Sequence, residues 1–474
     1  MDRSAILPSR PRSWRGEFGA TLRLSWPLAL ANLLQMLTYA IDVIFIARLG
    51  EEPLAASALS VSYFGLIFWA LSGLTGAVAP MISAELGRRA PALRPVRRTT
   101  RMALWLAVLS GALGMALCMT AGPFMRLTGQ EPRITALGSE YMAILVWSLI
   151  PMLLANVLRN FVSALDRALF ATLITAGGIF VNAFANYALI FGNFGMPALG
   201  LVGAGLATLI TSVLTVLAYV AVIALDRRLA RYRILGKWWR PDRDRLVDLI
   251  RIGTPIGLTI VAEGGIFSAA AFMMGRFGAL ELAAHTVALQ IAALAFQVPF
   301  GIGQAATIRV GYYYGARDPV GMARAGWSAI VVGTLFMACT ALAMLIVPKA
   351  LISIYVDVDA PENATLLVFA LRYLTVAAAF QLFDGLQAVA AGALRGLQDT
   401  RVPMWIAVFS YWVPGFGIAM GLGFGAELAG IGIWLGLATG LVVAAFLLVR
   451  RWTRRDRLGL TGRPAGEPAP LVAY

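Results

Sequence analysis

Long apolar runs alternate with short polar segments along the whole of this chain. A helix needs about 20 predominantly apolar residues to cross a bilayer, and twelve runs reach that length. We therefore predict an all-α integral membrane protein with twelve transmembrane helices. Their expected starts lie near residues 24, 54, 101, 137, 162, 198, 250, 281, 325, 366, 403 and 429.

The amino-acid composition is that of a membrane protein as well. Of the 474 residues, 59% are hydrophobic and 13% are charged, and the mean hydropathy is +0.78. A soluble domain carries about 25% charged residues. This chain therefore has too few polar side chains to cover a soluble surface.

Basic residues are distributed unequally between the predicted connections. We number the connections between consecutive predicted spans from the N-terminus. Of the 39 Lys and Arg residues, 33 fall in the tails and the even-numbered connections, and 6 fall in the odd-numbered connections. This positive-inside bias predicts that both termini are cytoplasmic. Orientation and contact with anionic lipid of the bilayer then account for the net charge of +15, so no nucleic-acid partner is expected. Residues 1–23 are interpreted as a cytoplasmic tail rather than a signal peptide, because the apolar run that follows is long enough to span.

A charged segment, residues 226–250, divides the chain almost in half. We interpret it as a cytoplasmic linker between an N-lobe, residues 24–225, and a C-lobe, residues 251–450. Residues 451–474 are expected to form a second cytoplasmic tail.

The two halves repeat each other at a shift of 228 residues without gaps. The shift superposes Pro27 on Pro255, Arg48 on Arg276, Gly50 on Gly278, Gly73 on Gly301 and Gly87 on Gly315. Each half has an even number of spans, so the two six-helix lobes are expected to be parallel repeats related by an axis along the membrane normal.

Three acidic residues lie inside predicted spans, where an ionisable group costs roughly 2.5–3.5 kcal/mol on insertion scales. The first is Asp42, which follows Gln35 and Tyr39 in the first predicted span and shares one helical face with them. Asn182 and Asn186 are four residues apart in the fifth span, and their amide groups could complete a cation or proton site with Asp42.

The other two acids, Glu263 and Asp384, lie in the second half. Asp384 has Gln381 and Gln387 three residues to either side, which places the three on one face. Gln290 and Gln297 add amides seven residues apart in the eighth span. Hard cations such as Na⁺ prefer oxygen ligands, and a desolvated carboxylate can instead carry a proton, so the coupling ion is left open between Na⁺ and H⁺.

Each of these candidates also has a structural interpretation. A buried acid can pair with an arginine of a neighbouring helix, and amides within spans often serve helix packing. Tyr39, Phe267 and Gln297 are candidate substrate-cavity residues, although aromatic side chains within spans commonly pack or face lipid.

Several classes of catalytic site are excluded by the residue counts. The chain has one histidine and two cysteines, which leaves no histidine-based metal site or catalytic triad to expect. No Walker-type phosphate loop is present, so ATP-driven transport is not expected. We predict a protein that is not an enzyme and that needs no cofactor.

Four segments together resemble the multidrug and toxic compound extrusion (MATE) family, and most closely its NorM-like bacterial branch. They are SWPLALANLLQMLTYAIDVIFIARLG, GTPIGLTIVAEGGIF, LAAHTVALQIAALAFQVPFGIGQAATIRVGYYYGA and AAGALRGLQDTRVP. The resemblance implies a multidrug efflux antiporter of the bacterial inner membrane. Such a protein exports small organic, often cationic compounds against an inward flow of Na⁺ or H⁺ by alternating access, and is associated with antibiotic resistance. We expect it to act as a monomer.

The resemblance also assigns site residues. Glu263 and Asp384 match the second-lobe acids associated with cation coupling, with Na⁺ as a possible ligand of both, and Asp42 matches the first-lobe acid. Some branches have an aspartate where this chain has Asn186, which weakens any mechanism that needs paired carboxylates in the first lobe.

Two alternative functions remain. One is a lipid-linked oligosaccharide flippase of related fold, which should line its cavity with cations, whereas the in-span charges here are expected to be mainly acidic. The other is an intramembrane enzyme or a channel, against which the missing catalytic motifs and the repeat both count.

Overall fold

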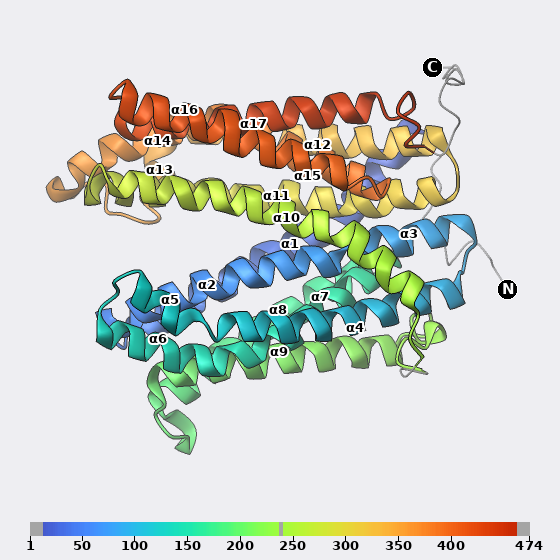
Figure 1. Ribbon diagram of the computed structural model, residues 1–474, viewed down its shortest axis with the longest axis horizontal. Coiled ribbons are helices and arrows are strands. Elements are labelled where there is room, and N and C mark those ends of the chain that lie inside the picture. The colour runs from blue at the N-terminus through green and yellow to red at the C-terminus, as the bar shows by residue number, and fades with distance from the viewer. Residues whose placement is uncertain (1–12, 237–239, 462–474) are drawn as a thin grey trace. The chain divides into compact units, whose positions relative to one another are not determined.

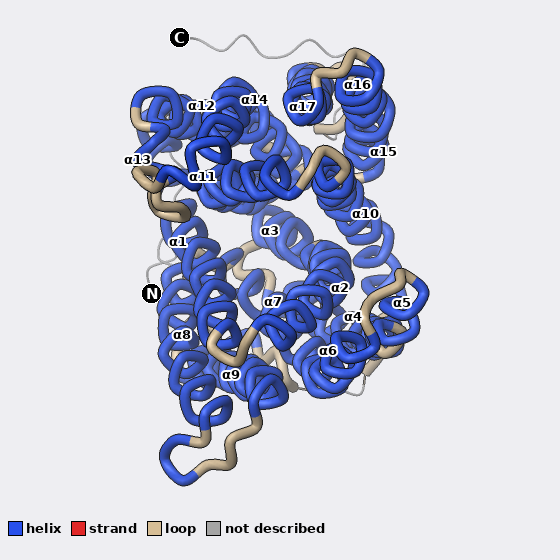
Figure 2. Tube along the Cα trace, turned by 90° about the vertical axis from the view of Figure 1, so that its left-hand side faces the viewer, coloured by secondary structure: helices blue, strands red, loops and turns tan. Residues whose placement is uncertain are grey.

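The computed structural model describes residues 13–236 and 240–461 (Figure 1). Within these ranges every regular element is a helix, and no strand appears in Figure 2. Residues 1–12, 237–239 and 462–474, which belong to the predicted tails and linker, lie outside the described part.

The α-helices are numbered in chain order. Their bounds are α1 (Trp14–Ala47), α2 (Glu51–Gly76), α3 (Val78–Arg88), α4 (Leu93–Cys118), α5 (Ala121–Leu127), α6 (Pro132–Leu145), α7 (Leu149–Ala164), α8 (Ala168–Phe191), α9 (Gly200–Leu225), α10 (Arg243–Gly275), α11 (Ala279–Gly315), α12 (Pro319–Ile346), α13 (Pro348–Ile352), α14 (Ala364–Gly396), α15 (Arg401–Ser410), α16 (Phe416–Met420) and α17 (Ala429–Thr453).

The described chain contains twelve helical segments long and apolar enough to span a membrane, which confirms the predicted number. The shortest, Ala168–Phe191, has 24 residues and so measures about 36 Å, longer than the roughly 30 Å hydrocarbon core. Helix α1 begins at Trp14, ten residues before its expected start. The polar residues at the start of α1 lower the local hydropathy, so the apolar pattern does not extend to them. The helix includes them because the carboxylate of Glu17 is paired with Arg309 inside the protein.

The described residues form two compact units. Unit 1 comprises residues 30–257, and unit 2 comprises residues 13–29 and 258–461. The first part of α1, up to Ala29, thus belongs to unit 2, and the first part of α10, up to Gly257, belongs to unit 1. The units are not continuous in sequence, so the lobe boundaries drawn at the linker stay a prediction.

Helix α7 is the central helix of unit 1. It packs against α2, α4 and α9, and α8 lies along α9. Its residues Leu149, Leu153, Val157 and Phe161 are fully buried and follow one another at intervals of four, which is the spacing of a single helical face.

Helix α14 has the same role in unit 2, where it packs against α11, α12 and α17. Small residues allow the close approach of α11, since a Cβ atom at Gly392 would lie 2.3 Å from the carbonyl oxygen of Gly303. Close backbone approach through small residues is a common way to join transmembrane helices. On the α17 side, the ring of Trp434 stacks on Tyr373 and Phe380, with both centroid distances 5.7 Å.

The predicted repeat reappears as matching contacts in the two units. In unit 1, Arg245 Nη1 lies 2.8 Å from Glu85 Oε1. A shift of 228 residues relates Arg245 to Glu17 and Glu85 to Tyr313, and in unit 2 the Tyr313 hydroxyl donates to Glu17 Oε2 at 2.9 Å. Arg309 Nη2 also donates to Glu17 Oε2 at 2.9 Å. Residues at equivalent positions of the repeat therefore hold the first turn of α10 in unit 1 and the first turn of α1 in unit 2, although the side chains differ.

The end of the linker is fixed to the start of α4. Arg98 donates to Asp242, and the backbone N–H of Arg245 donates to the same carboxylate at 3.4 Å, so Asp242 caps α10. Burial alone would raise the pKa of Asp242, but the hydrogen bonds from Arg98 and Arg245 outweigh it and hold the pKa below its usual value. Nearby, the Tyr232 hydroxyl donates to the carbonyl oxygen of Pro91 at 3.0 Å, and burial raises the pKa of Tyr232 to about 12.

Candidate functional site

Asp42, Asn182 and Asn186 form a hydrogen-bonded group in unit 1, which we call the unit 1 cluster. The amide nitrogens of Asn182 and Asn186 donate to Asp42 Oδ1 at 3.0 and 2.6 Å, and Asn186 also donates to Asn182 Oδ1 at 3.2 Å. No hydrogen bond from a described residue reaches Asp42 Oδ2. The structure brings the three predicted residues together: Asn182 and Asn186 share one face of α8, because they are four residues apart, and Asp42 reaches them from α1.

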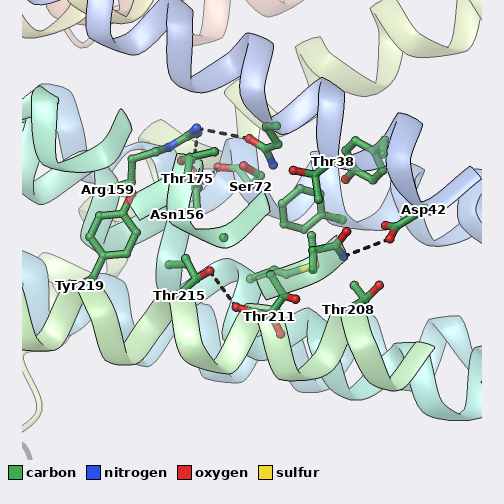
Figure 3. A pocket seen from close by; sticks show the side chains of 18 of the residues that line it. Thr38, Asp42, Ser72, Asn156, Arg159, Thr175, Thr208, Thr211, Thr215 and Tyr219 are labelled. Atoms are coloured by element: carbon green, nitrogen blue, oxygen red, sulfur yellow. Dashed lines mark hydrogen bonds between the residues drawn. The ribbon is translucent and has the colours of Figure 1, made fainter. Parts of the chain in front are cut away.

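The unit 1 cluster lies at one end of a pocket that, counted with the open solvent at its mouth, encloses about 940 Å³ of empty space (Figure 3). Predicted residues Gln35 and Tyr39 line the pocket together with Asp42 and Asn182. The other lining residues are Thr38, Phe68, Trp69, Ser72, Met152, Ala155, Asn156, Arg159, Thr175, Gly178, Thr208, Thr211, Ser212, Thr215 and Tyr219.

Arg159 is a pocket residue that the sequence analysis missed. It was assigned to a connection, because hydropathy ends a span at the first charged residue, but it lies inside α7. Arg309 and Arg395 were assigned in the same way and lie inside α11 and α14. The expectation that in-span charges are mainly acidic is therefore wrong. A spacing signal was available, since Asn156 is three residues before Arg159 on the same helical face.

Glu263, Asp384 and Gln387 form a hydrogen-bonded group in unit 2, which we call the unit 2 cluster. Gln387 Nε2 donates to Glu263 Oε1 at 2.9 Å and to Asp384 Oδ1 at 3.4 Å. Asp384 and Gln387 are buried, with 5% and 4% of their surfaces exposed. Two carboxylates thus share one amide donor in the middle of transmembrane helices α10 and α14.

The remaining predicted site residues lie elsewhere in unit 2. Gln381 is fully buried, and its amide atoms have no hydrogen-bond partner among the described residues. Gln290 is exposed, and Gln297 Nε2 donates to the carbonyl oxygen of Ala293 in its own helix at 3.4 Å. Phe267 packs against the hydrophobic core of the unit. Their predicted roles, as those of the cluster residues, stay predictions.

The unit 2 cluster has the donor set that a hard cation requires. Glu263 and Asp384 supply carboxylate oxygens, which are among the ligands that a hard cation prefers, and the amide nitrogen of Gln387 holds one oxygen of each. Among the described residues no group of three or more His, Cys, Asp and Glu side chains gathers as a metal site.

Comparison with known families gives two matches within the chain. The family model described as MatE matches residues 27–188 and residues 255–420. The two matches begin 228 residues apart, at Pro27 and Pro255, which is the shift of the internal repeat. Together they cover more than half of the chain.

Curated relatives match nearly the whole length. The "Probable multidrug resistance protein NorM" of Mesorhizobium japonicum is 44% identical over 446 residues, covering 94% of this chain and 95% of that protein. A protein of the same name from Brucella suis is 43% identical over 446 residues, with the same coverage. Among solved structures, the eukaryotic MATE transporter AtDTX14 has a TM-score of 0.85 at 19% identity, covering 95% of this chain and 98% of that one. That structural likeness supports the predicted twelve-helix fold.

Proposed function

The chain belongs to the MatE family, and from this premise we propose that it is a cation-coupled multidrug efflux antiporter. It would export small organic, often cationic compounds in exchange for Na⁺ or H⁺ that enters the cell. The curated relatives carry the names of multidrug resistance proteins and not of enzymes, which supports export of drug-like molecules. We further propose that the protein lies in the bacterial inner membrane as a monomer with both termini in the cytoplasm, as the positive-inside bias favours.

The observation that carries this proposal is the unit 2 cluster. Two carboxylates that share one amide donor inside a membrane protein repel each other unless positive charge lies with them. A cation or a proton that enters the cluster relieves this repulsion. Glu263 and Asp384 are therefore proposed as the coupling residues, and Gln387 as the amide that positions both.

Coupling needs only that the ion and the drug prefer different conformations. We propose that an ion in the unit 2 cluster favours one state of the transporter and a bound drug favours the other, so each ligand displaces the other across the membrane. One charge that moves through 100 mV supplies roughly 2.3 kcal/mol, enough for about a fiftyfold gradient of a neutral substrate.

Proteoliposomes test the assignment. Efflux of a fluorescent organic cation is measured under an imposed ion gradient for the unchanged protein, for Glu263→Gln and for Asp384→Asn. Gradient-driven efflux is expected to be lost in both variants, since each removes a carboxylate that the ion would contact. Asp359→Asn and Glu362→Gln are matched controls, because both acids are exposed in a loop of unit 2. Equal pumping by all five proteins would reject the assignment.

A flippase for lipid-linked oligosaccharides is less well supported. A pyrophosphate group is usually bound by several cationic side chains. The pocket of unit 1 is lined by one arginine, Arg159, and also by the carboxylate of Asp42, with hydroxyl and amide groups between them. An intramembrane enzyme or a channel has no observation in its favour.

A further inference from the structure

The eleventh membrane span, Arg401–Gly425, contains an irregular turn. Between α15 and α16 its residues Tyr411–Gly415 form a π-helical turn, η6. Pro414 lies inside this turn and has no N–H to donate, so one regular helical hydrogen bond is missing there. Single π-helical turns within α-helices are uncommon and often occur at functional sites. The side chains of η6 are therefore candidates for a role in transport.

Trp412 of η6 packs against α10 next to Glu263. Its indole Nε1 donates a hydrogen bond to the backbone carbonyl oxygen of Ala262 at 3.2 Å. Its ring covers Gly265, since a Cβ atom on that glycine would lie 2.9 Å from Cζ2 of Trp412. Residues three apart share a helical face, so one side chain makes both contacts. The indole thus holds α10 directly before Glu263 and two residues after it.

Two glycines follow Glu263 in α10 and make this part of the helix easier to deform. Glycine loses more conformational freedom on folding than any other residue, so it weakens a helix interior. A Cβ atom at Gly264 would meet no atom within 4 Å, whereas one at Gly265 would meet the ring of Trp412. The backbone that carries Glu263 is therefore supported on one face by a residue of another span.

The neighbouring residue of η6 lies near the charges of the unit 2 cluster. Tyr411 is buried, with 1% of its surface exposed, and it interacts electrostatically with both carboxylates of the cluster and with Arg395. Its hydroxyl group has no hydrogen-bond partner among the described residues. Two consecutive side chains of one turn thus lie at the cluster, one near its charges and the other against the backbone of α10.

We propose that Trp412 is a positioning residue for ion coupling, which fixes the backbone of α10 so that Glu263 can share an ion with Asp384. This inference rests on the proposed function, and it adds the eleventh span to the two helices that carry the cluster. Glu263 and Asp384 belong to different helices, so the distance between their carboxylates depends on how α10 is held. Groups that orient an ion ligand without contacting the ion typically change ion affinity roughly 10- to 100-fold when they are removed.

The ion dependence of efflux from proteoliposomes tests this role. Efflux of a fluorescent organic cation is followed against Na⁺ concentration at constant pH, and against pH without Na⁺, so that either coupling ion is covered. Trp412→Phe keeps an aromatic ring and loses the hydrogen bond to Ala262. We expect the ion concentration at half-maximal efflux to rise at least about tenfold, while the maximal rate changes by less than about twofold. Trp405→Phe is the matched control, because Trp405 is an exposed tryptophan of the same span, in α15.

A double-mutant cycle tests the contact with α10 itself. Gly265→Ala places a methyl group against the ring of Trp412, so it should also raise the ion concentration at half-maximal efflux. Trp412→Leu removes the ring, and in that background Gly265→Ala should add no further change. Gly264→Ala is the matched control, since it adds the same methyl group to the neighbouring glycine, where it meets no atom.

An unchanged ion dependence of Trp412→Phe would overturn the proposal even if that variant were slower or less stable, because a purely structural residue changes only rate and stability. Equal effects of Gly265→Ala with and without the Trp412 ring would overturn it too. If thermal unfolding in detergent shows that Trp412→Phe does not fold, the glycine variants decide. A shift confined to Gly265→Ala then supports the proposal, and equal ion dependence of Gly265→Ala and Gly264→Ala overturns it.

The proposed function fails in a different way. If the unchanged protein exported the dye with no dependence on Na⁺ or on pH, ion coupling would be rejected, and the inference with it. Ion-dependent export by the unchanged protein together with unchanged ion dependence of Trp412→Phe would reject the role of Trp412 alone.

Discussion

The polar clusters of the two units differ in the number of carboxylates that they contain. In unit 1 one carboxylate, Asp42, receives hydrogen bonds from two amides, whereas in unit 2 two carboxylates share the single amide of Gln387. The first arrangement has one carboxylate for two amide donors, whereas the second has two carboxylates for one amide donor. This difference favours unit 2 as the place where a small cation or proton acts, and leaves unit 1 free to contact a larger substrate.

The contacts that hold the first turns of α1 and α10 also differ between the units, because those of unit 2 are more deeply buried. Glu17 and Arg309 are buried in unit 2, with 1% and 6% of their side chains exposed. In unit 1 Arg245 has 24% of its side chain exposed, and Glu85 also contacts Arg88 at 3.4 Å. Equivalent positions are therefore expected to contribute unequally to stability.

The largest effect is expected from Glu17→Ala. The change removes the carboxylate that pairs with the buried Arg309, and breaking a buried ion pair costs about 3–5 kcal/mol. Arg245→Ala, at the equivalent position of unit 1, should cost about 1 kcal/mol or less, because the side chain of Arg245 is partly exposed to water and Glu85 keeps its contact with Arg88. The midpoint of thermal unfolding in detergent measures both. Equal losses of stability would contradict the comparison.

A smaller effect is expected from Gln387→Leu in the unit 2 cluster. Loss of an amide that orients two ligands typically lowers ion affinity roughly 10- to 100-fold. The ion concentration at half-maximal efflux should rise by that factor. Thr375→Val is the control, since Thr375 is an exposed polar residue of the same helix, α14, outside the cluster. If the two variants had the same ion dependence, Gln387 would have no part in coupling.

In unit 1, Asn186→Ala should act on drug binding and not on the ion. Asp42 keeps the hydrogen bond from Asn182 and loses one from Asn186, so affinity for a cationic dye should fall about tenfold or less. The ion concentration at half-maximal efflux should stay the same. A shift in ion dependence as large as that of Gln387→Leu would place coupling in unit 1 instead.

The smallest effect concerns the linker and depends on pH. The pKa of Asp242 is held below its usual value, so its interactions stabilise the fold above about pH 4, the ordinary range of an unfolded aspartate, and this stabilisation is lost as the pH falls below that range. Asp242→Asn should therefore lower stability by about 1 kcal/mol or less at neutral pH, and the difference from the unchanged protein should vanish in acid. Unfolding midpoints measured at several pH values test this, and a difference that persists in acid would contradict it.

The sequence predicted those features that depend on short-range periodicity. Apolar length identified the twelve spans, and the shift that superposes Pro27 on Pro255 identified the repeat. Spacing on a helical face grouped Asn182 with Asn186, and Asp384 with Gln387. In each case the signal lies within one helix or within a direct repetition of the chain.

Features that depend on contacts between distant helices were missed. The pairing of Glu17 with Arg309 joins positions 292 residues apart, and no local pattern encodes it. The hydropathy pattern predicts that Arg159 lies in a connection, because a hydropathy scale gives arginine the same polar value whatever surrounds it. Gln381 has the spacing of a site residue, yet its side chain is buried and has no hydrogen-bond partner in the part of the chain that the structure describes, since periodicity assigns a face and not a contact.

The central claim is that the unit 2 cluster couples ion entry to drug export. It is tested most directly by measuring the ions taken up per dye molecule released from proteoliposomes, with Na⁺ and pH gradients imposed separately. The unchanged protein should exchange dye for one of the two ions, and Asp384→Asn should release dye down its own gradient with no associated ion uptake. The same number of ions per dye in both proteins would contradict the claim.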